Sequence, residues 1–234
     1  MYFFFHLITG IILGLLISDF LKDQRWLIPC AIGAVLPDLI DKSIDYLLFP
    51  TTIGFGRIYS HTLFIAILVL AAGLAIWKVK KDPDLMAVGV GIFSHQVLDV
   101  MWLQPQNWYF PFLGPFKGAG MSDYFFVMTM RELKNPLEMI LAILFGAAIL
   151  IMIYGIKIPH SVSRTSRVVS IMATAGALLL CIISGILIGQ GISHQVFPEL
   201  GWVKPEELII GGIVIALGAG LIWRWQKNVF EASK

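Results

Sequence analysis

The chain has few charged residues and almost no cysteine. Only 14% of its 234 residues are charged, 58% are hydrophobic, and the mean hydropathy is +0.83. Soluble domains carry about 25% charged residues, so both a soluble globule and a disordered chain are excluded. Lys and Arg number 17 against 15 Asp and Glu, which leaves no basic surface for nucleic acid. Cys30 and Cys181 lie in apolar runs, which excludes a disulfide framework or a cysteine zinc cluster. A polytopic membrane protein remains.

Long apolar runs predict the membrane helices. A helix needs about 20 apolar residues to cross a bilayer, and lipid favours helices because they pair their own backbone groups. The candidate runs are 3–21, 61–77, 84–103, 137–156, 168–190 and 207–223. A shorter run, 26–37, ends at Pro37 and Asp38 and either crosses at a tilt or re-enters the same side. The sequence therefore predicts an all-α transmembrane bundle with six to seven membrane helices.

The loops predict an orientation. The first run has no basic segment before it and no small-residue cleavage site after it, so we expect it to be retained rather than removed as a signal peptide. If seven segments alternate and the C-terminus is cytoplasmic, most Lys and Arg residues lie inside, as the positive-inside rule requires. The N-terminus is then outside. Residues 104–135 are rich in aromatic side chains and form either an interfacial belt or a lid or ledge beside a site.

The ionisable residues of the apolar segments are few, and such residues often mark function in membranes. In the predicted topology they all lie near the outer ends of four helices: His6, Asp38, Asp41, His61, His95 and Asp99. His95 and Asp99 are four residues apart and share a helix face, and Asp38, Asp41 and Asp45 align in the same way. His6 shares a stripe with Gly10 and Gly14, where glycine permits a neighbouring helix to approach closely.

Three imidazoles and several carboxylates form a ligand set that suits zinc, with manganese or iron as alternatives. Surplus carboxylates can orient the imidazoles or act as a general base. Each residue also has an ordinary alternative. A histidine can bridge two helices by a hydrogen bond, and an aspartate can end a helix or face solvent. Their placement at one depth favours a metal site.

Four segments resemble one family: 6–10 (HLITG), 36–42 (LPDLIDK), 56–62 (GRIYSHT) and 94–99 (SHQVLD), the last followed by Trp102 and Pro105. They are similar to the predicted membrane-bound metal-dependent hydrolases, the YdjM-like group, which includes LexA-regulated inner-membrane members. The resemblance covers about residues 1–116 and implies a four-helix metal-site membrane domain. Residues 117–135 would be an aromatic extracytoplasmic loop, and 136–234 a C-terminal three-helix extension.

The residues and the resemblance together suggest a metal-dependent hydrolase. In this hypothesis His6, Asp38, His61 and His95 bind the ion. Asp41 and Asp99 are further ligands, orient a ligand or act as general base, and Arg57 holds an anionic group such as a lipid phosphate or anchors the chain at the interface. A site at the outer surface favours membrane lipids or an envelope-linked ester as substrate. The alternatives are a metal or proton transporter that uses the same residues, and a structural or regulatory bundle without activity.

Overall fold

The computed structural model describes residues 3–45, 56–116, 163–193 and 205–231, together with isolated positions between 126 and 143. Every regular element in these residues is a helix, which confirms the all-α class. The chain forms two compact units, Met1–Ala148 and Ile149–Lys234. The predicted span 137–156 and the aromatic stretch beyond Phe116 lie almost entirely outside the described residues.

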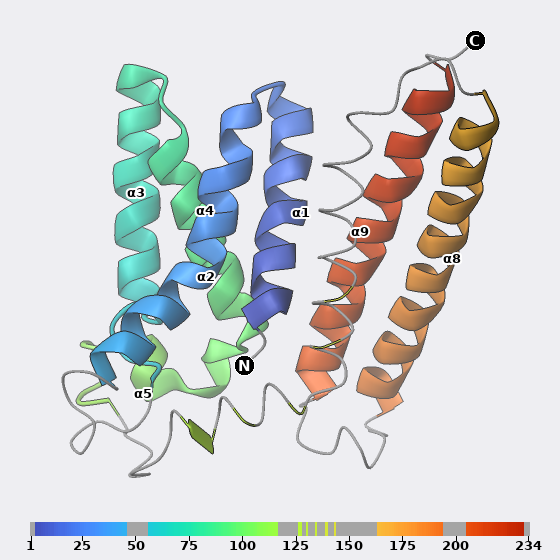
Figure 1. Ribbon diagram of the computed structural model, residues 1–234. Helices are drawn as coiled ribbons and strands as arrows, with labels where there is room; N and C mark the ends of the chain where they lie inside the picture. Colours follow the sequence, from blue (N-terminus) through green and yellow to red (C-terminus); the bar gives the residue numbers. More distant parts are fainter. Residues whose placement is uncertain are drawn as a thin grey trace. The chain divides into compact units, whose positions relative to one another are not determined.

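The first unit is built on four helices that run alternately up and down (Figure 1): α1 (Phe3–Leu21), α2 (Leu27–Ser43), α3 (Leu63–Lys80) and α4 (Asp84–Leu98). The described residues of this unit also form three short helices, η1 (Gln24–Trp26), η3 (Met101–Leu103) and α5 (Pro105–Trp108). The third helix begins after His61, not at it as predicted, because Thr62 caps the helix by accepting from the Ile65 amide. The fourth ends at Leu98 rather than at 103, since Val100 takes up a left-handed conformation (φ 47°) that a β-branched residue rarely adopts.

The second helix does not end at Pro37, where the apolar run ends. It continues to Ser43, with Pro37 inside it, and runs back beside α1. An internal proline removes one backbone hydrogen bond and bends a helix, and α2 changes direction along its length in Figure 1. The continuation matters because it keeps Asp38 and Asp41 on the buried face of a helix.

Glycines bring the backbones of α1, α2 and α4 together. A Cβ at Gly33 of α2 would collide with the carbonyl group of Val88, and a Cβ at Gly91 of α4 would collide with the carbonyl group of Cys30. A Cβ at Gly10 would lie 2.6 Å from that of Ala34, so α1 meets α2 along the stripe predicted from the sequence. This packing sets the depth and rotation at which side chains of the three helices meet.

We expect Gly33→Ala to disrupt the contact between α2 and α4. The added methyl group meets backbone atoms, which have no rotamer to change, so the cost is at least the 1–3 kcal/mol or so of an overpacked core. That corresponds to a fall of several degrees in the midpoint of thermal unfolding in detergent, at about 2–4 °C per kcal/mol. Gly185→Ala in α8 is the control, because its Cβ would have no atom within 4 Å. Equal midpoints for the two variants would contradict this account of the packing.

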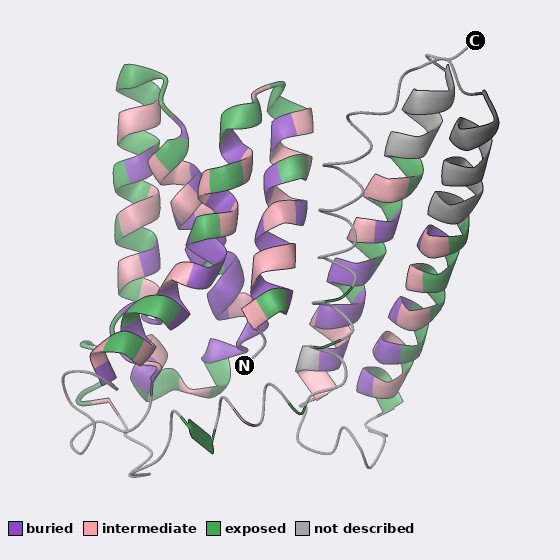
Figure 2. Cartoon of the chain, viewed as in Figure 1, coloured by how far each residue is buried: buried purple, intermediate pink, exposed green. Residues whose placement is uncertain are grey.

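Exposed apolar side chains cover the outside of the helices. In the described part, three helical segments are long and apolar enough to cross a membrane, Phe3–Leu21, Leu63–Lys80 and Ala175–Ser193, and two apolar helical segments are shorter, Asp84–Leu98 and Leu208–Arg224. Exposed positions follow α3 along its length in Figure 2, among them Phe64, Ile67 and Leu68. Apolar groups this exposed suit a lipid environment.

The second unit contains α8 (Ser163–Ser193) and α9 (Pro205–Glu231), which pack against each other. They correspond to the predicted runs 168–190 and 207–223, and both are longer than predicted. The Ser184 hydroxyl donates a hydrogen bond of 2.8 Å to the carbonyl group of Gly212, where the two helices approach closely. Small residues at such a crossing are typical of membrane helix pairs.

Candidate metal centre

Four side chains of the first unit converge in a small buried space. One potential ligand atom from each of Asp38, His61, His95 and Asp99 lies within 4.8 Å of the others. The two imidazole Nε2 atoms are 3.0 Å apart. Asp38 Oδ1 lies 3.6 Å from His61 Nε2 and 3.8 Å from His95 Nε2, and Asp99 Oδ2 lies 3.6 and 3.7 Å from the same two atoms. These four side chains are called the ligand group below.

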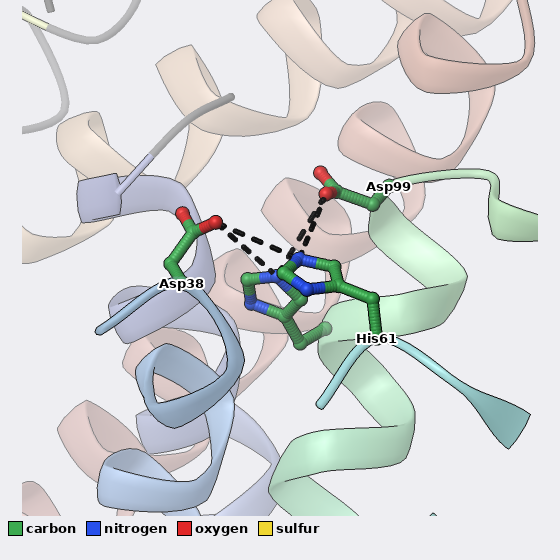
Figure 3. Close-up of side chains that lie close together, drawn as sticks. Asp38, His61 and Asp99 are labelled. Atoms are coloured by element: carbon green, nitrogen blue, oxygen red, sulfur yellow. Dashed lines mark hydrogen bonds and ion pairs between the residues drawn. The ribbon is translucent and has the colours of Figure 1, made fainter. Parts of the chain in front are cut away.

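Three different elements supply the ligand group. Asp38 comes from α2, His61 from the segment before α3, and His95 and Asp99 from the end of α4, one helical turn apart. Figure 3 shows the carboxylates of Asp38 and Asp99 directed at the His61 imidazole from either side. All four residues are at most 3% exposed, so water competes little with whatever binds between them.

The partners of the Nδ1 atoms determine which nitrogen of each imidazole carries a proton. His61 Nδ1 lies 2.7 Å from Asp41 Oδ2, and His95 Nδ1 lies 2.7 Å from the carbonyl oxygen of Ala34. A carboxylate and a carbonyl group only accept hydrogen bonds, so both Nδ1 atoms carry hydrogen. In the neutral rings the Nε2 lone pairs then face each other, which is how histidine is prepared for a metal ion.

The two carboxylates leave one oxygen each turned to the same space. Asp38 Oδ1 is buried and accepts no hydrogen bond from any residue that the structure describes, and Asp99 Oδ2 is buried with the Arg57 guanidinium as its ion-pair partner. Each carboxylate also has a cation, with Lys42 Nζ 2.9 Å from Asp38 Oδ2 and Arg57 Nη2 2.9 Å from Asp99 Oδ2. Buried acceptors normally have partners. The two Nε2 atoms, 3.0 Å apart, need a proton or a metal ion between them, and one oxygen of each carboxylate faces the same space.

Asp41 lies behind His61 and fixes the segment that carries it. Its Oδ2 accepts from the backbone amides of Ile58 (2.7 Å) and His61 (3.3 Å) as well as from the imidazole, and its Oδ1 accepts from the Ser60 amide (2.9 Å). Both oxygens are therefore occupied. Because the segment 56–62 also carries Arg57, one buried carboxylate positions two of the predicted site residues.

His6 lies beside the ligand group. Its ring stacks on His95, with centroids 3.8 Å apart and an angle of 22° between the planes. His6 Nε2 is 3.3 Å from Asp99 Oδ1, the oxygen that faces away from the other ligand atoms. The structure thus brings together all seven predicted site residues, with Asp99 in the ligand group and His6 next to it.

Gln96 is a site residue that the sequence reasoning missed. It is fully buried, and its amide nitrogen donates to the carbonyl groups of Ser60 (3.2 Å) and Thr62 (2.9 Å), on both sides of His61. Its amide oxygen accepts a 2.9 Å hydrogen bond from Trp108 Nε1 in α5. A buried amide next to His95 in an apolar run was the available signal. Lys42, four residues after Asp38, was likewise missed.

Gln96→Leu should destabilise the segment 60–62, which carries His61. The change leaves two carbonyl groups and one indole N–H without their partner, each at about 1–3 kcal/mol if water does not replace it. We expect a lower unfolding midpoint and weaker metal binding, measured by thermal unfolding and by titration with zinc. Gln24→Leu, at an exposed glutamine in η1, is the control. If both variants behave alike, Gln96 does not position His61.

The fold and the site together define an integral membrane protein with a buried cluster of acidic and imidazole groups. The family model described as YdjM inner membrane protein matches residues 1–192, and the chain belongs to this family. The resemblance of the four sequence motifs is thereby confirmed, and the match extends past residue 116, where those motifs end. Comparisons with curated proteins and with solved structures found no match.

Proposed function

We propose that the protein is an integral-membrane, metal-dependent hydrolase. The observation that carries the proposal is the ligand group, in which two imidazole nitrogens and two buried carboxylate oxygens face one space. Nitrogen and oxygen donors in this number fit zinc, and manganese and iron are the alternatives. When bound, the ion would supply a Lewis acid that lowers the pKa of water toward neutrality.

The protein's own residues would orient the ligands and transfer the proton. Asp41 orients His61, because both of its oxygens already accept hydrogen bonds and neither is available to take a proton from water. We assign proton transfer to Asp99, because its Oδ1 lies 3.3 Å from His6 Nε2 and could pass a proton to that ring. His6, which the sequence predicts as a metal ligand, is thus a proton-accepting neighbour of the ligand group in this proposal.

The substrate is proposed to be an ester or a phosphoester at the outer membrane surface. Arg57 supports an anionic substrate, since its guanidinium is paired with Asp99 at the edge of the ligand group. The side of the membrane rests on the positive-inside prediction. Because the site lies at the end of α1 that begins at Phe3, an outside N-terminus would place it on the extracytoplasmic side.

The arrangement of buried groups favours hydrolysis over transport. Among the described residues, all buried Asp and His side chains lie at the end of the bundle that holds the ligand group. The opposite end of α1 has exposed ion pairs, Lys22–Asp19 and Arg25–Asp23. The hydrogen bond from Arg25 lowers the pKa of Asp23, which keeps that carboxylate charged and paired. A transporter needs binding groups accessible from both faces.

The test is hydrolysis by the zinc-loaded, purified protein in vesicles of phosphatidylethanolamine and phosphatidylglycerol, with release of water-soluble phosphate esters as the readout. We expect turnover that a chelator abolishes, that Asp99→Asn loses, and that Asp84→Asn keeps, because Asp84 is exposed at the other end of α4. If the protein binds stoichiometric zinc and moves zinc into the vesicles but cleaves no ester, it is a transporter and not a hydrolase.

A further inference from the structure

We infer that the substrate is a phosphate ester of a membrane lipid and that Lys42 binds its phosphate group together with Arg57. This inference rests on the proposed function and adds a substrate class and a residue to it. Three features of the first unit carry it: the charge of the accessible part of the site, the way the two cations share carboxylates with the ligand group, and the apolar surface next to them.

The part of the site that reaches its surface is cationic. The side chains of Asp38 and Asp99 are 2% and 3% exposed, whereas those of their partners Lys42 and Arg57 are 20% and 13% exposed. The side chains of the site that reach solvent most therefore carry an ammonium and a guanidinium group. Such groups favour phosphate, which a guanidinium can bind through two hydrogen bonds and an ammonium as a point charge.

Each cation is bound to a carboxylate that also faces the ligand group. Lys42 contacts Asp38 through Oδ2 while Asp38 Oδ1 faces the imidazoles, and Arg57 contacts Asp99 through Oδ2, the oxygen that faces the imidazoles. A divalent ion in the ligand group would draw on the negative charge of both carboxylates. Lys42 and Arg57 would then hold positive charge that is less fully compensated, at half-buried positions where the oxygens of a phosphate group could accept from each.

An exposed apolar surface lies along the segment that carries Arg57. Tyr59, Phe112 and Leu113 are 40%, 74% and 56% exposed. Ring contacts hold this surface in place, with centroids 6.3 Å apart for Tyr59 and Phe116 and 5.8 Å apart for Phe64 and Phe112. A cationic group beside exposed aromatic and aliphatic side chains matches the chemistry of a lipid, whose phosphate is anionic and whose chains are apolar.

A soluble phosphate ester would contact the two cations but not the apolar surface. Two probes therefore distinguish a soluble phosphate from the phosphate of a lipid. The first probe is inorganic phosphate, titrated calorimetrically into the zinc-loaded full-length protein in detergent. The second is phosphatidic acid in phosphatidylcholine nanodiscs that contain the zinc-loaded protein, with binding followed by the phosphorus NMR signal of the lipid. Zinc content is measured on every sample first.

We expect Lys42→Met to weaken phosphate binding about tenfold or more, the value of one charge-assisted hydrogen bond, and to retain its zinc. Lys42→Arg should restore most of the binding, and Lys22→Met, at an exposed lysine at the other end of the bundle, should match the wild type. Phe112→Ser should weaken the binding of phosphatidic acid and leave inorganic phosphate unchanged, with Phe20→Ser, at a highly exposed residue of α1, as its control.

Two results would overturn the inference alone: zinc-loaded Lys42→Met that binds phosphate as the wild type does, or Phe112→Ser that binds phosphatidic acid as Phe20→Ser does. The first removes Lys42 from the phosphate site, and the second replaces the lipid with a soluble ester. Wild-type protein that takes up no zinc would overturn the proposed function and this inference with it.

Discussion

His61→Ala and His95→Ala are each expected to remove nearly all bound metal from the purified protein. Each change deletes one of two imidazoles whose Nε2 atoms are 3.0 Å apart, and it leaves two carboxylates and one ring. The loss of metal affinity should exceed about 10- to 100-fold, which is the loss caused by substituting a residue that only hydrogen-bonds to a metal ligand. The measurement is metal content by mass spectrometry after gel filtration, with zinc supplied during purification.

Two other variants test whether the loss of metal is specific to the ligand group. His6→Ala should retain zinc with lower affinity, because His6 stacks on His95 and lies outside the ligand group. Asp84→Ala, at an exposed position in the first turn of α4, should match the wild type. If His6→Ala emptied the site while His61→Ala kept its zinc, the assignment of the ligand group would be wrong.

Asp41→Ala is expected to destabilise the protein and to lower its metal affinity together. The change removes the acceptor of three backbone amides and of His61 Nδ1, all in a buried segment. At about 1–3 kcal/mol for each buried donor left unsatisfied, the total is at least about 3 kcal/mol, a fall of roughly 6 °C or more in the unfolding midpoint. Metal affinity should fall roughly 10- to 100-fold, because His61 loses the group that orients it.

Asp41→Asn should have an intermediate effect. Its amide oxygen can take the place of Oδ2 and accept from Ile58 and the His61 ring, while its amide nitrogen would face the Ser60 amide and lose that one hydrogen bond. Thermal unfolding with and without zinc separates the two contributions. Asp41→Ala with wild-type stability and wild-type zinc affinity would show that Asp41 neither holds the segment nor orients His61.

The architecture could be predicted from the sequence because its cause is local. A run such as 3–21 has no Asp, Glu, Lys or Arg before Asp19 that could stop a membrane helix, and α1 spans that range in the structure. The spacing of His95 and Asp99 likewise placed them on one face, since four residues make about one helical turn. Gly10 correctly indicated a close neighbour, because a missing side chain on a helix face leaves room for one.

The assignment of roles within the site depends on contacts that the spacing does not contain. His61 and Arg57 lie in a segment without helical periodicity, and its conformation follows from hydrogen bonds to Asp41, about 20 residues earlier. The end of α4 beside Asp99, at a left-handed Val100, is signalled by no pattern in the sequence. The carbonyl group of Ala34 holds His95 from another helix, which packing alone brings within 2.7 Å.

X-ray absorption spectroscopy of the zinc-loaded protein tests the central claim most directly. If Asp38, His61, His95 and Asp99 hold the ion, the spectrum will show nitrogen and oxygen ligands at about 2.0–2.2 Å and the scattering of two imidazole rings. Substitution of His95 should remove one ring from that signal. Sulfur at about 2.3 Å, the distance of a cysteine thiolate such as that of the buried Cys30, or a spectrum without imidazole, would contradict the account.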